Sequence, residues 1–334
     1  MYREKGLTSL PKIGISLGDP VGIGPEIILK ALFSSQDLPK AHYILFGSSA
    51  AIQREREALD LSLKIEPFQE ISDLSETRIS LIEVNSFPTS LKPGLLQKES
   101  GFLSFRYFEE TVKQVRDGRI HALVTAPISK QAWSLAGIHW SGHTEYLSQM
   151  YPKVIMCFWS DKLKVALFSH HLSLRKAIER IERNSLFHFF LRLYDSLSAQ
   201  PSDHFRFLVA GLNPHAGEQG LIGSEENDEI APAVKDAQAK GMDIQGPFPP
   251  DVVFRMARNQ EQTIVIALYH DQGLIPFKLE SFEEGVNVSL GLPFVRTSPD
   301  HGTAFDIAGK GMANPKSMIE AIKLAHKLSS FVSL

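Results

Sequence analysis

Short apolar runs that resemble β-strands alternate along this chain with stretches whose apolar residues recur at helical spacing. This alternation restricts the fold more than any other feature. The apolar runs predict strands at Ile13–Leu17, Tyr43–Phe46, Ile120–Val124, Val165–Phe168, Phe205–Leu212 and Thr263–Tyr269. The helical candidates are Glu26–Leu32, Ser104–Arg116, Ser185–Ser198 and Lys316–Leu328. Such an order favours an α/β fold with a mixed, largely parallel sheet and helices on both of its faces.

Length and composition limit the class of protein. A chain of 334 residues exceeds what one hydrophobic core usually supports, so we expect two lobes. A hydrophobic content of 43% and a charged content of 22% are ordinary for a soluble globular protein. The net charge of −3 argues against nucleic acid as a partner, although a local cluster of Lys and Arg can still bind a small anion.

The expected location is the cytoplasm. No apolar run approaches the roughly 20 residues that span a membrane, and the first residues lack the apolar core of a secretion signal. The single cysteine, Cys157, cannot form a disulfide within the chain and lies in an apolar stretch. It is predicted to be a buried structural thiol in a reducing compartment.

Three histidines, His171, His215 and His270, follow closely on three of the predicted strands. Ligands of open α/β sheets bind beyond the carboxyl ends of the strands, so these imidazoles can converge there. Three neutral imidazoles without a nearby thiolate suit a divalent cation that keeps open positions for a substrate. The alternative for each histidine by itself is a place in a capped turn or in the core.

Several loops are richer in polar groups than plain turns require. Gly18–Glu26 leads from a strand into a helix and is either a tight turn or an anion site, and it lacks the third glycine of the dinucleotide fingerprint. Gly142–Glu145 contains His143 and Thr144, although His143 could simply neighbour a helix cap. Asp300–Pro315 is a long, glycine-containing loop without a phosphate-loop pattern.

Three further polar residues, Lys278, Asn287 and Arg296, interrupt otherwise apolar sequence. A lone Lys or Arg is usually a solvated surface charge. Arg296 lies at the end of an apolar strand, where burial would demand a partner for its charge. A phosphate or carboxylate ligand would provide that partner.

Five motifs in this order resemble the 4-hydroxythreonine-4-phosphate dehydrogenase family over nearly the whole chain. They are Gly18–Glu26, Gly142–Glu145, Gly211–Glu218, Tyr269–Gly273 and Arg296–Ala304. The first and last are also similar to motifs of isocitrate and isopropylmalate dehydrogenases, which bind the nicotinamide cofactor without a Rossmann fold. The resemblance implies two αβα lobes with the active site in the interlobe cleft. We expect a cofactor-side lobe of residues 1–130 with 290–334 and a metal and dimerisation lobe of residues 131–289.

The resemblance also implies the reaction. NAD oxidises 4-phosphooxy-L-threonine at its C3 hydroxyl, and the β-keto acid loses carbon dioxide to give 3-amino-2-oxopropyl phosphate, a precursor of pyridoxal phosphate. One divalent ion (Zn, Mg or Co) per active site would bind His171, His215 and His270. The implied substrate contacts are His143, Thr144, Lys278, Asn287 and Arg296. The implied cofactor contacts are His301, Gly302, Thr303 and Asp306. The family's active site lies at a homodimer interface and draws metal ligands from both subunits.

Some alternatives stay open. Lys278 and Asp251 are the catalytic candidates, although Asp251 is equally suited to a simple turn. The doublet His170-His171 stands where the family has a single histidine, and alignment favours His171 as the ligand. A sibling enzyme acting on D-threonate or D-erythronate 4-phosphate would keep the same residues. A metal-dependent hydrolase is a more distant alternative, and it leaves Asp300–Pro315 without a role.

Asp306 bears on the choice of cofactor. A carboxylate can accept hydrogen bonds from the adenosine ribose, yet it repels the additional 2′-phosphate of NADP. We therefore expect NAD to be preferred. The alternative is that Asp306 only caps the turn that leads to Gly309.

Overall fold

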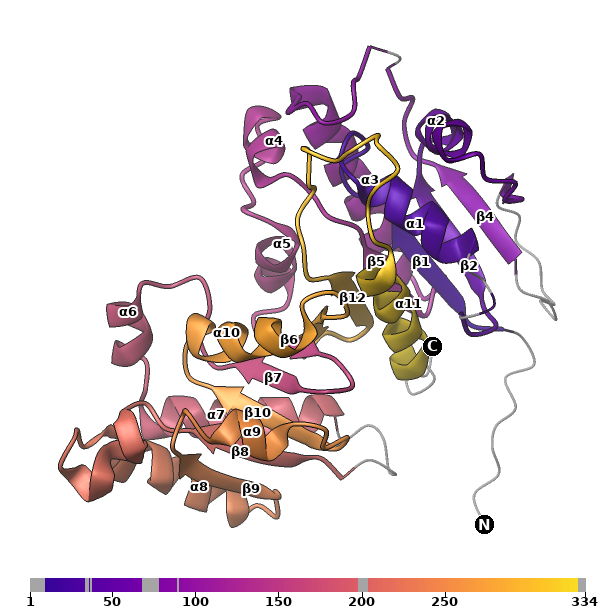
Figure 1. The fold of residues 1–334 in the computed structure, drawn as a ribbon. Helices are drawn as coiled ribbons and strands as arrows, with labels where there is room; N and C mark the ends of the chain where they lie inside the picture. Colours follow the sequence, from indigo (N-terminus) through magenta and orange to yellow (C-terminus); the bar gives the residue numbers. More distant parts are fainter. Residues whose placement is uncertain are drawn as a thin grey trace, which may run out of the picture. The chain divides into compact units, whose positions relative to one another are not determined.

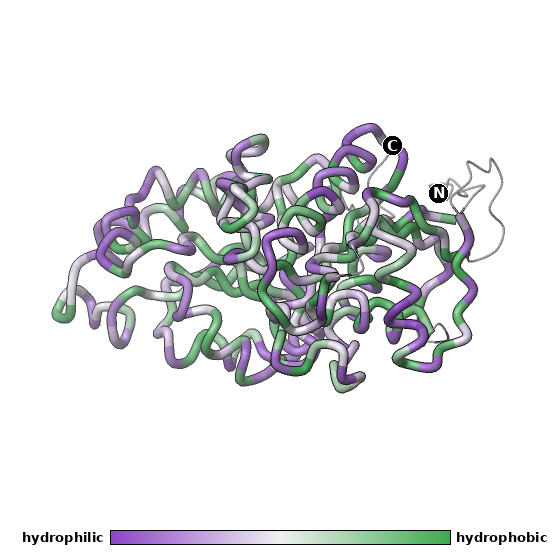
Figure 2. The backbone as a smooth tube through the Cα atoms, turned by 90° about the horizontal axis from the view of Figure 1, so that it is seen from above, coloured by the Kyte–Doolittle hydropathy of each residue, from purple (hydrophilic) through white to green (hydrophobic). Residues whose placement is uncertain are grey.

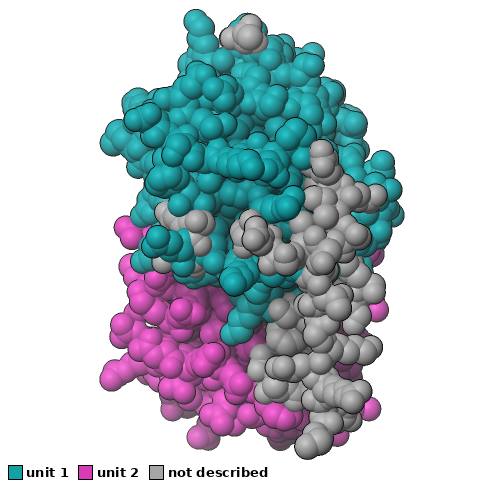
Figure 3. Space-filling model, turned by 90° about the vertical axis from the view of Figure 1, so that its right-hand side faces the viewer, with its two compact units in different colours: residues 1–150, 293–334 teal, residues 151–292 magenta. Residues whose placement is uncertain are grey.

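The computed structural model describes residues 10–33, 36, 38–67, 78–88, 90–197 and 204–329. The chain folds into two compact units, one formed by residues 1–150 and 293–334 and the other by residues 151–292 (Figure 3). The expected division, after residues 130 and 289, differs mainly at the first boundary. Residues 131–150 belong to unit 1 because helix α4 (Lys130–Leu135) packs on α3 (Lys98–Arg116), where Trp133 stacks edge-on against Phe105.

Unit 1 contains a parallel sheet with the strand order β3-β4-β2-β1-β5-β12. The strands are β1 (Lys12–Ser16), β2 (His42–Gly47), β3 (Glu66–Pro67), β4 (Arg78–Glu83), β5 (Ala122–Thr125) and β12 (Val295–Pro299). The other helices of this unit are α1 (Gly24–Phe33), α2 (Ser49–Leu59), α5 (His143–Met150) and α11 (Lys316–Ser329).

Register shows which helices cover which face of this sheet. Gly14 approaches Thr111 of α3, whereas Thr297 donates a hydrogen bond to the Ala321 carbonyl of α11. Because Gly14 pairs with Leu123 and Thr297 pairs with Val124, these two residues point to opposite faces. The sheet therefore lies between α3 on one side and α11 on the other (Figure 1).

Unit 2 contains the strand order β11-β6-β7-β10-β8-β9. Its strands are β6 (Ile155–Trp159), β7 (Lys164–Leu167), β8 (Arg206–Ala210), β9 (Ile244–Phe248), β10 (Thr263–Ala267) and β11 (Val286–Leu290). The pairs β11·β6 and β6·β7 are antiparallel, and the remaining pairs are parallel. The predicted α/β class with a mixed, largely parallel sheet is therefore confirmed.

The helical segments of unit 2 connect these strands. They are α6 (Leu174–Glu179), α7 (Arg183–Leu197), η2 (Pro214–Gly220), η3 (Glu226–Ile230), α8 (Ala231–Gln238), α9 (Val253–Ala257) and α10 (His270–Ser281). Apolar and polar residues alternate along most helices of the chain, which lets one side of each helix enter a core (Figure 2). In the core of unit 2, Phe277 of α10 packs with Val165 and Val265.

The six predicted strands and four predicted helices all correspond to observed elements, with shifted ends. Ser198, the last residue of one predicted helix, lies outside the described residues. Cys157 is buried as predicted, and burial raises the pKa of its thiol to about 12. Within the described ranges, no helix combines the length and apolar character needed to cross a membrane.

Candidate functional site

Buried polar side chains join three neighbouring loops at the carboxyl edge of the unit 2 sheet. The Ser169 hydroxyl donates to the Leu268 carbonyl at 2.7 Å, and the Leu268 amide donates to Gln272 Oε1 at 2.7 Å. Gln272 Nε2 in turn donates to the Gly211 carbonyl at 2.7 Å. The bonds connect the loops after β7, β10 and β8, which are adjacent in the sheet. The predicted metal ligands His171 and His215 follow two of these strands, and His270 begins the helix after the third loop.

Two of the three histidines lie close together. The ring centroids of His171 and His270 are 6.0 Å apart. Two imidazoles bound to one tetrahedral ion have centroids roughly 5–6 Å apart, so this spacing fits a shared cation. His270 Nδ1 lies 2.6 Å from Asp271 Oδ1, the kind of carboxylate pairing that orients imidazole ligands. Imidazole nitrogens suit zinc and cobalt, whereas magnesium prefers oxygen ligands.

His215 lies on an exposed turn with unusual backbone angles. Residues His215 to Gln219 all have positive φ, from 43° to 77°, and four of the five are not glycine. His171 also has a positive φ of 51°. Each such conformation costs an L-residue about 1–2 kcal/mol, and strain of this kind concentrates at functional sites. Within the described part of the chain, no group of three His, Cys, Asp or Glu residues is arranged to hold a metal.

The remaining predicted residues of unit 2 lie on α10, on β11, beside His171 and in the turn before α9. Lys278 is half-buried on α10, two turns beyond His270, and Asn287 is half-buried on β11. His170 packs edge-on against His171, with ring centroids 5.1 Å apart. Asp251 is exposed in the turn before α9, and no hydrogen bond or ion pair joins it to a histidine among the described residues.

In unit 1, Arg296 is buried at the α3 face of the sheet, as its apolar surroundings in the sequence suggested. Its side chain is 3% exposed, and Nη2 donates to Thr125 Oγ1 at 2.7 Å. The same Nη2 lies 3.2 Å from Nδ1 of His143, the first residue of α5. Burial lowers the pKa of Arg296 to about 10, whereas the charge of Glu145 opposes that shift. The guanidinium therefore stays charged at neutral pH.

The protonation of His143 follows from these neighbours. Burial and then the charges of Arg296 and Lys130 hold the pKa of His143 well below its usual range, so the ring is neutral. Since a guanidinium can only donate, Nδ1 accepts and the ring proton resides on Nε2. The Nε2 atom is buried without a hydrogen-bond partner among the described residues, and the ring packs 4.5 Å from that of Phe108.

This arrangement suits an oxyanion. It offers a buried guanidinium together with an unused N–H donor. Thr144, the next residue in the first turn of α5, is also buried. Arginine binds phosphate and carboxylate through paired donors, which are strongest where water is excluded. Arg296, His143 and Thr144 are thus the predicted substrate residues that the structure places at one location within unit 1.

The loop predicted to bind the cofactor also belongs to unit 1. His301, Gly302 and Asp306 are exposed and accessible to a ligand, and Thr303 is half-buried. The glycine-containing motif before α1 supports the start of this loop, because the Ile23 amide donates to the Thr303 carbonyl at 3.0 Å. A Cβ at Gly22 would lie 3.0 Å from the Thr303 side chain, so the two segments are in close contact.

The last residue of the same motif supports the end of the loop. Glu26 is 1% exposed, and its Oε1 accepts from the Ala313 amide at 2.8 Å and from Lys30 Nζ at 2.7 Å. Lys30 Nζ also donates to the carbonyls of Gly311 and Ala313 at 2.8 and 2.9 Å. Gly18–Glu26 is therefore a support for the predicted cofactor loop.

Sequence reasoning missed several residues of these two regions. Thr125 follows the apolar run that predicted β5, and Gln272 lies within the motif that carried His270. A search for polar residues at strand ends would have included Thr125. Glu226 is 3% exposed beneath the His215 turn, and its position in an acidic, surface-like stretch of sequence offered no signal.

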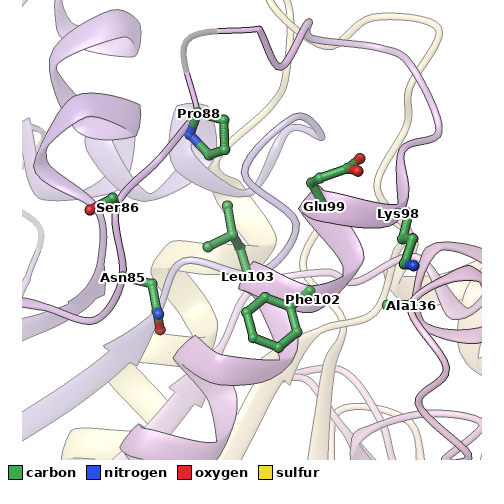
Figure 4. A pocket seen from close by; sticks show the side chains of 8 residues that line it. All are labelled: Asn85, Ser86, Pro88, Lys98, Glu99, Phe102, Leu103 and Ala136. Atoms are coloured by element: carbon green, nitrogen blue, oxygen red, sulfur yellow. The ribbon is translucent and has the colours of Figure 1, made fainter.

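A separate pocket of about 410 Å³ lies in unit 1 near the start of α3 (Figure 4). Its lining is largely apolar, with Phe102, Leu103 and Pro88 beside the charged Lys98 and Glu99. None of the predicted site residues lines it.

Comparisons with known proteins place the chain in a family of dehydrogenases. The chain matches the family described as "Pyridoxal phosphate biosynthetic protein PdxA" over residues 39–325. It is 41% identical over 326 residues to a 4-hydroxythreonine-4-phosphate dehydrogenase of Sulfurihydrogenibium, covering 94% of this chain and 97% of the relative. It is 40% identical over 328 residues to a D-threonate 4-phosphate dehydrogenase of Pectobacterium atrosepticum, covering 95% and 99%.

A solved structure is similar as well. The crystal structure of 4-hydroxythreonine-4-phosphate dehydrogenase from Klebsiella pneumoniae superposes with a TM-score of 0.84 at 36% identity, covering 98% of this chain and all of the other. The chain belongs to the PdxA family.

Proposed function

We propose that this protein is an NAD- and metal-dependent dehydrogenase that oxidises 4-phosphooxy-L-threonine, a step in pyridoxal phosphate biosynthesis. The observation that carries the proposal is the buried group of Arg296, His143 and Thr144, which suits the phosphate of a small substrate. Its presence in a member of the PdxA family supports this reading. The single buried cysteine fits the reducing cytoplasm, where we expect the enzyme to work.

The reaction removes a hydride from C3 of the substrate and a proton from its C3 hydroxyl. NAD accepts the hydride, and the carbon becomes the ketone of a β-keto acid. That acid then loses its carboxylate as carbon dioxide and gains a proton to give 3-amino-2-oxopropyl phosphate. A divalent ion, when bound, would lower the pKa of the hydroxyl and favour negative charge on the same oxygen during decarboxylation.

The residues of this chain have distinct proposed roles. Arg296 binds the phosphate, and the Nε2 proton of His143 hydrogen-bonds a substrate oxygen. Thr144, Lys278 and Asn287 complete the substrate contacts. Lys278 is the catalytic candidate, because an ammonium beside the reacting carbon can transfer a proton. Asp251 is a weaker candidate because its turn is exposed.

His171, His215 and His270 are proposed to hold the divalent ion, whether zinc, cobalt or magnesium. The close approach of His171 and His270, with Asp271 on the second ring nitrogen, supports this assignment. The left-handed backbone of His171 and His215 supports it further, because such strain is maintained at functional sites.

A second copy of this chain is the proposed partner, in a homodimer with the active site at the interface. Ile275, Leu279 and Phe282 are 60%, 83% and 76% exposed on one side of α10 and just beyond it. Exposed apolar side chains of this size mark interaction surfaces. The same helix begins at His270, so a partner covering it would adjoin the metal ligands and could contribute to them.

The second candidate function is oxidation of D-threonate 4-phosphate, or of its relative D-erythronate 4-phosphate. The 40% identity to a D-threonate 4-phosphate dehydrogenase favours it. These substrates share the phosphate and the hydroxyl and differ at the carbon that carries the amine.

A substrate comparison tests the main proposal. With NAD and a divalent ion, we expect at least tenfold higher kcat/KM for 4-phosphooxy-L-threonine than for D-threonate 4-phosphate. Preferential turnover of D-threonate 4-phosphate would establish the second candidate instead.

The Arg296→Ala variant tests the phosphate site. Hydrogen bonds to a charged phosphate contribute about 1.5–3 kcal/mol each, so Arg296→Ala should lower kcat/KM by roughly one to two orders of magnitude. Equal turnover of the dephosphorylated substrate by the wild type would contradict the phosphate site.

The zinc content of single-residue variants tests which histidines bind the metal. After exposure to zinc and dialysis, His171→Ala, His215→Ala and His270→Ala should each retain far less zinc than the wild type, because each loses a ligand. His170→Ala is the matched control and should retain zinc normally. The opposite pattern for His170 and His171 would show that the ligand is the other member of the doublet.

Cofactor preference tests Asp306. The wild type should use NAD with at least tenfold higher kcat/KM than NADP, because the carboxylate repels the 2′-phosphate. Asp306→Lys should reduce that ratio, and Asp306→Asn, which keeps the size and removes the charge, should give an intermediate value. Equal use of both cofactors by the wild type would rule out this role.

Sedimentation measures the proposed dimer. The wild type should sediment at twice the chain mass, and Leu279→Asp should shift the equilibrium toward monomer because it places a charge in an apolar interface. Leu95→Asp is the control, since Leu95 is a leucine of unit 1 that is 52% exposed and is not part of the proposed surface. A monomeric wild type, or equal effects of both substitutions, would contradict the assignment of this surface.

A further inference from the structure

The turn that carries His215 is held by two buried side chains that no catalytic role requires. We propose that Glu226 and Gln272 are positioning residues for the metal site. They fix the left-handed turn of His215 and join it to the loops of the other two histidines. This inference rests on the proposed function, in which His215 binds the divalent ion.

The turn has an unfavourable backbone conformation. His215, Ala216, Glu218 and Gln219 all adopt left-handed angles, which L-residues disfavour because Cβ approaches the following carbonyl. Main-chain hydrogen bonds contribute to the turn, such as the Ala216 amide to the Asn213 carbonyl at 3.1 Å. A run of this kind persists only where its surroundings determine it.

Glu226 fixes the start of the turn. It is 3% exposed, and its Oε1 accepts from the amides of Leu212 and Asn213 at 2.8 and 2.7 Å. Its Oε2 accepts from the Asn213 side-chain amide at 2.9 Å. A buried carboxylate is stable when donors surround it, and here those donors belong to the two residues before Pro214.

The same carboxylate also lies against the middle of the turn. A Cβ at Gly217 would be 2.7 Å from Glu226 Oε2, and a Cβ at Gly211 would be 3.2 Å from Oε1. Gly217 has φ of 77°, so glycine satisfies both the close approach and the backbone angle at this position. Glu226 therefore contacts the residues just before the turn and the middle of the turn.

The element that presents Glu226 is itself anchored. Glu226 begins the π-helical segment η3, and Glu229 in that segment accepts from the Arg183 amide at the start of α7 at 2.6 Å. The Arg183 side chain also pairs with Asp236 of α8 at 2.7 Å. The carboxylate is thus presented by a segment tied to two helices.

Gln272 connects the turn to the other histidine loops. Its side chain is 8% exposed and joins the Leu268 amide to the Gly211 carbonyl. Gly211 is the residue that Glu226 also contacts, so the two side chains act on one point of the backbone. Substituting a residue that orients a metal ligand without binding the metal itself lowers metal affinity by about 10–100-fold.

Zinc affinity of the metal-stripped, full-length protein, measured by competition with a chromophoric chelator, tests this proposal. In Glu226→Gln, the side-chain oxygen can still accept from the Leu212 and Asn213 amides, but its N–H₂ then faces the Asn213 side-chain N–H₂, so the turn loses support. We expect zinc to bind about 10–100-fold more weakly, with unchanged circular dichroism. Asp228→Asn is the matched control, an exposed acid in the same segment, and should leave the affinity unchanged.

A rescue variant separates positioning from simple attraction between Glu226 and the cation. Gln219 is exposed and left-handed, and glycine adopts that conformation without penalty. Adding Gln219→Gly to Glu226→Gln should therefore recover much of the lost zinc affinity. Failure to recover any of it would mean that the charge of Glu226 acts directly, which would overturn the proposal.

Gln272→Met provides the second variant, since it keeps the side-chain length and removes both hydrogen bonds. This variant should also weaken zinc binding, and it tests the proposal independently if Glu226→Gln does not fold. Wild-type affinity in every folded variant would overturn the positioning roles alone. A wild-type protein that binds no zinc would overturn the proposed metal function, and the positioning roles with it.

Discussion

The buried hydrogen bonds at Leu268 and Gln272 are the constraint on which the histidine region depends. The Leu268 carbonyl accepts a hydrogen bond from the Ser169 hydroxyl, and the Leu268 amide donates one to the Gln272 side chain. The Gln272 side chain in turn donates to the Gly211 carbonyl. Three adjacent strands of unit 2 would otherwise end in three independent loops. Because each buried donor has an acceptor on the neighbouring loop, displacing one loop would leave unsatisfied polar groups on the next. Two strained histidine conformations are maintained in this setting.

In unit 1, buried hydrogen bonds likewise support a loop, here the loop proposed to contact NAD. The motif Gly18–Glu26 supports the exposed loop from His301 to Ala313 at both ends, through the Ile23 amide and through Glu26 with Lys30. The loop residues proposed to contact NAD stay accessible, while the motif that holds them is buried. Arg296 and His143 form a second buried group in the same unit. The proposed metal and NAD sites are thus supported by buried polar groups that do not bind the ligand, whereas Arg296 and His143 are proposed to bind the substrate directly.

The sequence predicted the elements whose pattern is local. The apolar runs in β5 and β10 are continuous because parallel strands are buried on both faces, so composition alone identifies them. The start of α3 was predicted too late, at Ser104 rather than Lys98, since Ser100 and Gly101 are poor helix formers. Gly101 is favoured there by tertiary contact, because a Cβ would lie 2.2 Å from the Ala132 carbonyl.

The candidate site was predictable only in part, because its contacts depend on tertiary packing as well as on local sequence. Burial of Arg296 followed from its apolar neighbours in sequence, and its contact with Thr125 follows from strand pairing that sequence does not display. The left-handed turn at His215 depends on Glu226, which follows the turn and lies in an acidic, surface-like segment. Contacts of this kind arise from packing, and no local pattern encodes them.

Anomalous diffraction at the zinc edge, from crystals of the full-length protein grown with zinc, measures the central claim directly. The account predicts a strong peak within bonding distance, about 2.0–2.1 Å, of imidazole nitrogens of His171, His215 and His270, whether these come from one copy or from two. A peak bound by His170 in place of His171, or a peak remote from His215, would contradict it.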